Sequence, residues 1–349
     1  MLARRSVMGT AVFAVVLALV AAGCGSSSDS SSSETTDTTD TTAGSSMRVA
    51  VVTDIGGLND KGFNALAYEG LQQAKAKYGV EGRALISKSA ADYVPNLSTA
   101  AKQGYDLVIA VGFLMGDSIA TVAAQYPDTK FAIIDVNAGG LKGKPTNVRG
   151  IVFAEQEAGC LVGVAAATES TSGTISSVGG LKIPPVDAYI AGYQYCAKQV
   201  KPDIKTLNGY SQDFVAQDKC QELALNQIGQ GSDVVFQVAG QCGLGAITAA
   251  GDKGVWGIGV DNDQAFLGPQ VLTSAQKKVN VGVSDTIGLV VDNTFKGGVD
   301  GLFNTANDGV GYGKVSEKAT NRDELIATLD EWTKKLTDGD VKPPRVLTG

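Results

Sequence analysis

The 349-residue sequence contains no histidine and only two tryptophans. The absence of histidine removes the usual proton shuttle of enzymes and the commonest metal ligand of proteins. Neither a GxxxxGKS/T phosphate loop nor a GxSxG nucleophile motif occurs. The net charge of −7 argues against nucleic acid as a partner, because binding to phosphates needs a basic surface. We therefore expect a protein that is not an enzyme and that holds no metal or cofactor.

The first 24 residues have the composition of a targeting segment. Arg4 and Arg5 precede an apolar run at residues 12–22, which is short for a membrane span. The run ends in Leu-Val-Ala-Ala-Gly before Cys24, and small residues ahead of a cysteine are similar to a bacterial lipobox. We expect residues 1–23 to be a lipoprotein signal peptide and Cys24 to carry a lipid after cleavage. The alternative is an ordinary signal peptide followed by an incidental cysteine.

Residues 24–46 contain almost no apolar side chains. Fifteen of these 23 residues are serine or threonine, so the segment buries too little surface to offset its chain entropy. We expect a disordered tether between a lipid anchor in the cell membrane and an extracytoplasmic globular part.

The four remaining cysteines show no CxxC spacing, and a zinc site without histidine is not expected. Export permits disulfides, and four cysteines allow three pairings. We expect Cys160 to pair with Cys196 and Cys220 with Cys242, because each pair lies on neighbouring predicted elements. Four free buried thiols are the alternative.

Short β-branched runs alternate with amphipathic stretches from residue 48 onward. The runs VVTD, LVIAVG and FAIID are almost wholly apolar, which is typical of strands covered on both faces of a parallel sheet. In the first half, strands are predicted at residues 48–54, 84–87, 106–112 and 130–136, and helices at residues 63–78, 93–103 and 113–125.

The second half repeats this plan. Strands are predicted at residues 147–154, 174–179, 203–210, 233–239, 255–261 and 270–274. Helices are predicted at residues 155–168, 186–200, 216–229, 244–253, 281–295 and 322–336, the last with Asn321 as its N-cap.

These patterns predict an α/β protein of two doubly wound lobes that face each other across a hinged cleft. The N-terminal lobe comprises residues 47–153 and 275–310, and the C-terminal lobe comprises residues 154–274 and 311–349. We expect a monomer. In such sheets ligands bind beyond the carboxyl ends of the strands, so the residues that follow each strand are the candidates for the site.

The first strand ends at Asp54, and Asn59, Asp60, Phe63 and Asn64 follow within ten residues. Asp60 suits the N-cap of the next helix, whereas Asp54 suits the cleft. Phe63 either starts the core stripe of that helix or offers a flat face to a ring. Two carboxylates would repel a phosphate, so a ligand rich in hydrogen-bond donors is expected here.

Similar residues end the other strands. Phe113 follows the third strand and Asp135 the fourth, and Asp261 ends a strand of the second lobe. Gly240 opens a loop of spacing GxxGxG, which is not the dinucleotide fingerprint and is either a close approach to a ligand or a plain tight turn. Lys277 follows a strand near the hinge and is either a surface lysine or part of the site.

The opening stretch, with Gly56-Gly57, Asn59-Asp60-Lys61 and Phe63-Asn64, resembles the signature of the basic membrane protein family of bacterial lipoproteins. The resemblance continues through VGFLMGDSIATVAAQYPDTKFAIID, GLKIPPVDAYIAGYQ, GSDVVFQVAGQCGLGAI, GIGVDNDQ and VLTSAQKKV, and covers most of residues 48–338. It implies a type I periplasmic-binding-protein-like fold and a substrate-binding protein of an ABC importer, whose permease would be the partner.

The resemblance also implies a ligand, because purine nucleoside receptors belong to this family. It assigns stacking on the base to Phe63, a bond to the base edge to Asp54, and the ribose to Asp261 and Lys277. A second stacking aromatic would be Phe113, Phe214 or Phe236. The sequence departs from the family at Gly62, where serine is usual, and at residues 240–243, where Gly-Gly-Thr-Gly is common.

The expected function is therefore capture of a nucleoside, most simply a purine, for an ABC importer. The alternatives are a sugar-type or signalling receptor of the same fold, or a nucleosidase or glycosidase that uses two close carboxylates. A sugar pocket would be richer in tryptophan than this chain.

Overall fold

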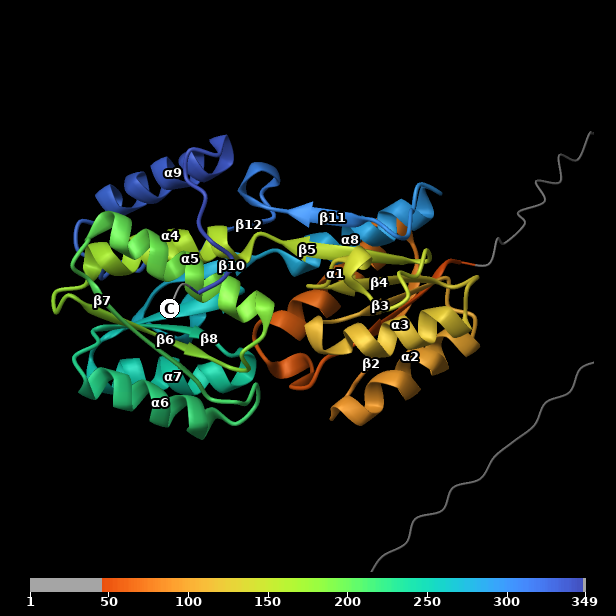
Figure 1. Ribbon diagram of the computed structural model, residues 1–349, viewed down its shortest axis with the longest axis horizontal. Coiled ribbons are helices and arrows are strands. Elements are labelled where there is room, and N and C mark those ends of the chain that lie inside the picture. Colours follow the sequence, from red (N-terminus) through yellow and green to blue (C-terminus); the bar gives the residue numbers. More distant parts are fainter. Residues whose placement is uncertain (1–45, 348–349) are drawn as a thin grey trace, which may run out of the picture. The chain divides into compact units, whose positions relative to one another are not determined.

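The computed structural model describes residues 46–347, which form two six-stranded sheets with helices on both faces of each (Figure 1). The strand orders are β11-β5-β4-β3-β1-β2 and β12-β10-β9-β8-β6-β7. This confirms the predicted fold class of two doubly wound α/β lobes. The predicted signal peptide, Cys24 and tether residues 24–45 lie outside the described residues.

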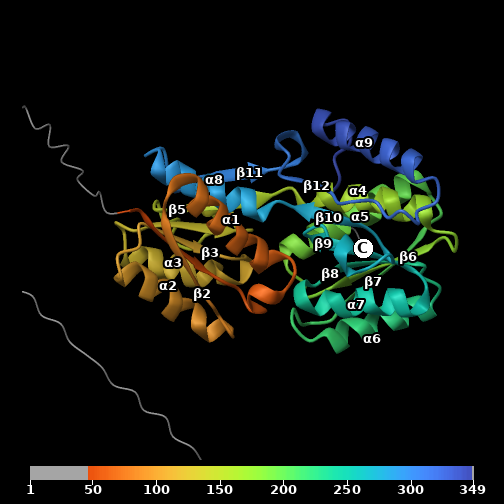
Figure 2. The same cartoon turned by 180° about the vertical axis from the view of Figure 1, so that it is seen from behind.

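The first sheet is parallel throughout, and α1 and α8 cover one face while α2 and α3 cover the other (Figures 1 and 2). Its strands are β1 (Arg48–Val52), β2 (Glu81–Leu85), β3 (Leu107–Ala110), β4 (Lys130–Ile134), β5 (Val148–Phe153) and β11 (Asp300–Phe303). The helices are α1 (Phe63–Tyr78), α2 (Tyr93–Lys102), α3 (Gly116–Gln125) and α8 (Val279–Val291).

The second sheet is parallel except for β12, which runs antiparallel to β10. Helices α4 and α5 cover one face, and α6 and α7 cover the other (Figures 1 and 2). The strands are β6 (Thr174–Gly179), β7 (Lys205–Tyr210), β8 (Val234–Val238), β9 (Trp256–Asp261), β10 (Val271–Lys277) and β12 (Val310–Tyr312). The helices are α4 (Glu155–Glu169), α5 (Pro184–Val200), α6 (Gln217–Gly229), α7 (Gly240–Lys253) and α9 (Arg322–Asp338).

Several predicted boundaries are wrong. Strand β2 begins three residues earlier than predicted, and β11 and β12 were not predicted. The predicted loop at Gly240 is the first turn of α7, and Lys277 lies within β10 rather than after it. Asn321 is the N-cap residue of α9, as predicted, but it has a φ of 48° and its side chain makes no capping hydrogen bond.

Helix α1 shows how the sequence pattern produces packing. Its buried stripe includes Leu66, Ala67 and Leu71, spaced for one helical face, and Gly79 ends the helix in the left-handed conformation at φ 70°. A Cβ on Gly70 would lie 2.4 Å from the carbonyl oxygen of Asn280, so glycine is needed for the close approach of α1 to α8.

Helices α4 and α5 approach each other even more closely. A Cβ on Gly159, Gly163 or Gly192 would lie 2.0–2.2 Å from a carbonyl oxygen of the facing helix. The disulfide Cys160–Cys196 joins the same two helices, and Cys220–Cys242 joins α6 to α7. These are the pairs expected from the sequence.

The chain passes between the two sheets after β5, after β10 and after β11. Three neighbouring connections of this kind suit a hinge. Within residues 46–347, none of the helices has the length and apolar character to cross a bilayer.

Candidate functional site

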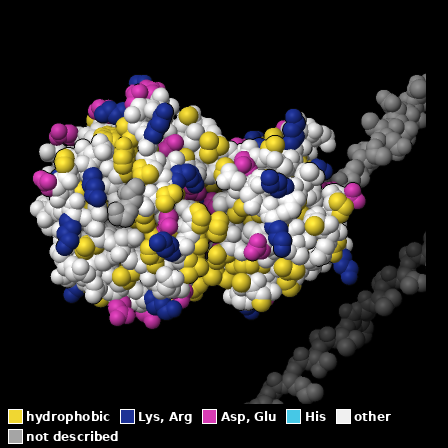
Figure 3. All heavy atoms as spheres, viewed as in Figure 1, with side chains coloured by type: hydrophobic (Ala, Val, Ile, Leu, Met, Phe, Trp, Pro, Cys, Tyr) yellow, Lys and Arg dark blue, Asp and Glu magenta, His cyan; other side chains and the backbone are white. Residues whose placement is uncertain are grey.

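A cavity lies between the carboxyl ends of the strands of the two sheets, with an empty volume of about 650 Å³ that includes space open to solvent. Hydrophobic side chains gather along the boundary of the two lobes on the face shown in Figure 3. The cavity is lined by Asp54, Ile55, Asp60, Phe63, Asn64, Gly112, Phe113, Asp135, Ile183, Pro185, Val186, Tyr189, Phe214, Val238, Gly240, Gln241, Val260, Asp261 and Lys277.

Nine of the ten predicted ligand-binding residues line this cavity, from both lobes. The exception is Asn59, which is exposed at the end of a short 3-10 turn, Gly57–Asn59, and is not part of the lining. Asn59 therefore lies outside the lining, and its contact with a ligand stays a prediction.

Asp54 keeps one carboxylate oxygen free for a ligand. Its Oδ1 accepts hydrogen bonds from the Tyr93 hydroxyl and, at 2.7 Å, from the Ile55 N–H, while no described residue donates to Oδ2. Asn64 holds the backbone of Asp54, because its Oδ1 accepts the Asp54 N–H at 2.8 Å. Burial raises the pKa of Asp54 to about 6, although the hydrogen bonds from Tyr93 and Ile55 oppose the rise.

Asp60 uses its carboxylate oxygens to bind the start of helix α1 instead. Its two oxygens accept the N–H groups of Gly62, Asn64 and Ala65 at 2.7–3.1 Å and the Asn64 side-chain amide at 3.1 Å. The Asn64 and Ala65 N–H groups are orphan donors of the first turn of α1. Asp60 therefore caps the helix as predicted, but from two residues before the N-cap position, which Gly62 occupies. Asp60 therefore lines the cavity with little acceptor capacity left.

Lys277 is the one cation among the described residues that line the cavity, and it is 1% exposed. Its Nζ lies 2.6 Å from Asp135 Oδ1 of the first lobe and 3.3 Å from Glu155 Oε1 at the start of α4. Burial by itself would lower the pKa of Lys277, but the carboxylates of Asp135, Glu155 and Asp261 outweigh burial and raise it. The lysine is therefore a charged group with three N–H donors, one of which is given to Glu155.

Asp135 and Asp261 occupy matching places at the ends of β4 and β9. Both have left-handed backbones, with φ 69° and 62°, a conformation that aspartate tolerates better than most residues. Burial raises the pKa of Asp261 to about 6, against the opposing effect of Lys277, and raises the pKa of Asp135 as well. Asp261 Oδ1 accepts the Tyr189 hydroxyl at 3.1 Å, and its second oxygen has no donor among the described residues.

Aromatic side chains line both walls. Phe63 and Phe113 come from the first lobe and Phe214 and Tyr189 from the second. Phe236, a candidate from the sequence, is fully buried against Tyr193 and is excluded from the lining. The ring of Phe214 fits against Gly180, because a Cβ there would lie 2.3 Å from the ring.

The sequence analysis missed several groups that shape the site. Tyr93 and Tyr189 each donate to a cavity carboxylate, and Glu155 supports Lys277 while accepting from Arg345 Nη2 at 2.7 Å. These partners are 39 to 190 residues apart in sequence, so no local spacing reports them. The Pro184-Pro185 start of α5 was the one local signal near Tyr189.

The two lobes touch across the cavity. Gln264 Nε2 donates to the carbonyl oxygen of Lys61 at 3.3 Å, and the Lys277–Asp135 ion pair crosses from the second sheet to the first. Within residues 46–347, no group of three or more acidic or cysteine side chains is arranged to hold a metal ion. The arrangement suits enclosure of a neutral ligand that offers hydrogen-bond donors and a flat ring.

Comparison with known proteins shows the family of the chain. Residues 47–341 match the model of the Bmp family, described as ABC transporter substrate-binding protein PnrA-like. The chain is 33% identical to the CD4+ T-cell-stimulating antigen of Listeria monocytogenes over 95% of its own length and 98% of that protein. It is 35% identical to the ABC transporter nucleoside-binding protein BmpA of Lactococcus lactis, covering 86% of this chain and 90% of the relative.

Solved structures share the fold. A solute-binding protein of an ABC transporter system from Aeropyrum pernix superposes with a TM-score of 0.76 at 25% identity, over 85% of this chain and 92% of that one. A similar protein from Conexibacter woesei gives a TM-score of 0.69 at 24% identity, over 86% and 99% of the two chains. These relatives are binding proteins rather than enzymes, and the chain belongs to the Bmp family of PnrA-like ABC transporter substrate-binding proteins.

Proposed function

We propose that this substrate-binding protein captures a purine nucleoside between its lobes and delivers it to an ABC importer. The observation that carries the proposal is a cavity with aromatic walls from both lobes and free carboxylate oxygens at separate points. A purine offers two flat faces to such walls and several N–H donors at its edge. The printed name of the Lactococcus lactis relative, a nucleoside-binding protein, supports the same ligand class.

Each part of a nucleoside has a matching group in the cavity. Phe63 and Phe214 line the cavity from opposite lobes and would stack on the base. Asp54 Oδ2 lies next to Phe63, since a Cβ on Gly112 would approach both within 3.1 Å, and it would accept an N–H from the base edge. Asp261 and Lys277 then offer an acceptor and a donor for ribose hydroxyls.

The negative charge around the cavity should favour binding of nucleosides over nucleotides. Asp54, Asp135, Glu155 and Asp261 surround the site, and Lys277 is already paired with two of them. A phosphate would add negative charge to this acidic surrounding without a free cation, which costs binding energy. We therefore expect adenosine to bind and AMP to bind far more weakly or not at all.

Calorimetry tests the proposal directly. Purified mature protein is titrated with adenosine, guanosine, inosine, cytidine, free purine bases, AMP, ribose and xylose. The expected result is a dissociation constant of about 1 µM or tighter, roughly −8 kcal/mol, for at least one purine nucleoside. Heat from a sugar alone, or from none of the nucleosides, contradicts the proposal.

We also propose that Cys24 anchors the protein as an extracytoplasmic lipoprotein. Small residues before Cys24 and the serine- and threonine-rich residues after it support this assignment. Replacement Cys24→Ala should move the protein from the membrane fraction to the medium or periplasm. Retention of the variant in the detergent phase would contradict the anchor.

A further inference from the structure

We propose that Gln241 reads the edge of the bound heterocycle and lets the site accept both amino- and oxo-purines. The inference rests on the proposed nucleoside function and adds a specificity-determining residue to it. Gln241 lines the cavity from the first turn of α7, between Gly240 and the disulfide-bonded Cys242.

Among the described lining residues, Gln241 is the carboxamide whose side-chain donor and acceptor are both unused. The other lining carboxamide, Asn64, accepts from Asp54 and donates to Ile55 and Asp60. No described residue donates to or accepts from the Gln241 side chain, which is half-buried. It therefore offers a donor and an acceptor side by side, whereas the carboxylates only accept and Lys277 only donates.

The residue lies beside the aromatic wall. The Cys242 N–H donates to the carbonyl oxygen of Phe214 at 3.0 Å, and a Cβ on Gly240 would lie 3.5 Å from the same oxygen. Gln241 therefore lies between two residues whose backbones are close to the backbone of Phe214. A ring stacked on Phe214 would present its edge to this turn, on the opposite wall from Asp54.

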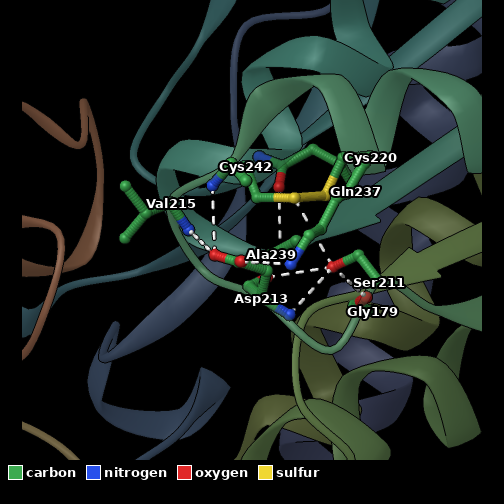
Figure 4. Close-up of a disulfide and its surroundings, with 10 residues drawn as sticks. Gly179, Ser211, Asp213, Val215, Cys220, Gln237, Ala239 and Cys242 are labelled. Atoms are coloured by element: carbon green, nitrogen blue, oxygen red, sulfur yellow. Dashed lines mark hydrogen bonds and ion pairs between the residues drawn. A yellow bond between two sulfur atoms is a disulfide. The ribbon is translucent and has the colours of Figure 1, made fainter.

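The turn that carries Gln241 is held in place. Cys242 is bonded to Cys220 of α6, and its Sγ lies 3.4 Å from Ser211 Oγ in the loop before Phe214 (Figure 4). That loop is fixed by Asp213, whose Oδ1 accepts the Val215 and Ala216 N–H groups at 2.8 and 3.1 Å. A side chain on a rigid support loses less entropy when it binds, which favours a role in selection.

The chemistry of a carboxamide explains how one site could accept both amino- and oxo-purines. At the edge that carries N7, adenine presents an N–H donor beside the N7 acceptor, whereas hypoxanthine presents a carbonyl acceptor beside N7. A glutamine amide can accept the adenine N–H while donating to N7, or donate its two N–H groups to the hypoxanthine carbonyl and N7, but a glutamate can only accept. Gln241→Glu should therefore keep one hydrogen bond to adenosine and none to inosine, since both inosine groups at this edge are acceptors and a carboxylate opposes them.

The test measures the ratio of the inosine to the adenosine dissociation constant at pH 8, where an introduced glutamate is ionised. The wild-type ratio is expected within about tenfold of one, and Gln241→Glu should raise it by about tenfold or more. Gln241→Met, of similar length but without donor or acceptor, should weaken both nucleosides severalfold and leave the ratio unchanged. Gln230→Glu at the C-cap of α6, an exposed position in the same lobe, controls for the added charge.

The outcomes separate the two proposals. If the wild type binds nucleosides and Gln241→Glu leaves the ratio unchanged, Gln241 does not read the base and this inference is wrong. If the wild type binds no nucleoside, the proposed function and the inference are both overturned.

Discussion

The same residue type does different work at neighbouring positions of the cavity. Asp60 accepts hydrogen bonds from four donors at the start of α1. In contrast, Asp54 and Asp261 each have one carboxylate oxygen without a partner among the described residues. The two free oxygens belong to carboxyls whose pKa burial raises to about 6. Ligand binding should therefore depend on the protonation of Asp54 and Asp261.

The pH dependence of affinity follows from these shifts. Below pH 6 the carboxyls become protonated and lose acceptors that the ligand uses, so affinity should fall by about tenfold per pH unit for each group. The stability of the ligand-free protein should change with pH in the opposite direction to the affinity. A pKa raised in the folded state from 3.8 means that this contribution to stability decreases as the pH rises through the range 4–6.

Tyr93→Phe tests the assignment to Asp54. The Tyr93 hydroxyl lowers the pKa of Asp54, so its removal should move the midpoint of the pH–affinity curve to higher pH and cost about 1–2 kcal/mol of stability. Calorimetric titrations with one nucleoside between pH 5 and 8 give the midpoint. Tyr105→Phe, a buried tyrosine on the far end of the same lobe, should leave the midpoint unchanged.

The residues at the ends of strands could be predicted because parallel strands bring them to one edge by topology alone. Asp54, Asp135 and Asp261 were found in this way, and all three line the cavity. Their partners could not be predicted, since Tyr93 reaches Asp54 across 39 residues and Tyr189 reaches Asp261 across 72. Such contacts depend on how helices pack, which local patterns do not encode.

At the scale of elements, α7 shows where tertiary packing overrides propensity. Glycine disfavours helices, and the sequence analysis predicts a loop at Gly240-Gln241-Cys242-Gly243 with the helix beginning only at Leu244. In the structure these residues form helix because the backbone must lie close to its neighbours. A Cβ on Gly243 would lie 1.8 Å from the Gln237 side chain, and one on Gly245 would lie 2.0 Å from the Gln217 carbonyl oxygen. Strands β11 and β12 were missed for another reason, since both are short, glycine-containing edge strands.

The two disulfides brace different helix pairs and should have different effects on binding. Cys220–Cys242 holds the turn of α7 next to Phe214 and Gln241, whereas Cys160–Cys196 joins α4 to α5. The chain-entropy model gives both similar stabilities of about 3–4 kcal/mol, because they close loops of similar length. We expect the Cys220→Ser/Cys242→Ser variant to lose nucleoside affinity by about tenfold.

The Cys160→Ser/Cys196→Ser variant is the matched control. It should lose a similar amount of stability in urea denaturation but change affinity by less than about threefold, since those helices already pack through glycines. Titrations are carried out at low temperature, where both variants remain folded by circular dichroism. Equal losses of affinity in the two variants would show that the α6–α7 bridge has no particular connection with the site.

At the scale of the whole described molecule, the ligand site is also where the lobes are joined. Lys277 extends from β10 of the second sheet to Asp135 of the first, directly before the chain crosses to α8. Glu155, just after the crossing from β5, completes the cluster and is held by Arg345. Because the same charges contact both lobes and the cavity, closing the lobes and binding the ligand should be coupled.

Lys277→Met tests this coupling through stability. Removal of the lysine leaves Asp135, Glu155 and Asp261 buried without their cation, which costs about 3–5 kcal/mol at neutral pH. The remaining carboxyls should respond with still higher pKa values, so the folded state binds protons that the unfolded state has already released. The stability of Lys277→Met should therefore fall steeply as the pH rises from 5 to 7.5, and much more steeply than that of the wild type.

Urea denaturation followed by circular dichroism at pH 5, 6 and 7.5 measures the difference. Lys219→Met removes a lysine whose partner, Asp213, is on the surface, and should leave both the stability and its pH dependence close to those of the wild type. A Lys277→Met protein as stable at pH 7.5 as at pH 5 would mean that the three carboxylates are solvated without the lysine. The lobes would then stand apart in solution when no ligand is bound, and the ion pair between them would form only on closure around the ligand.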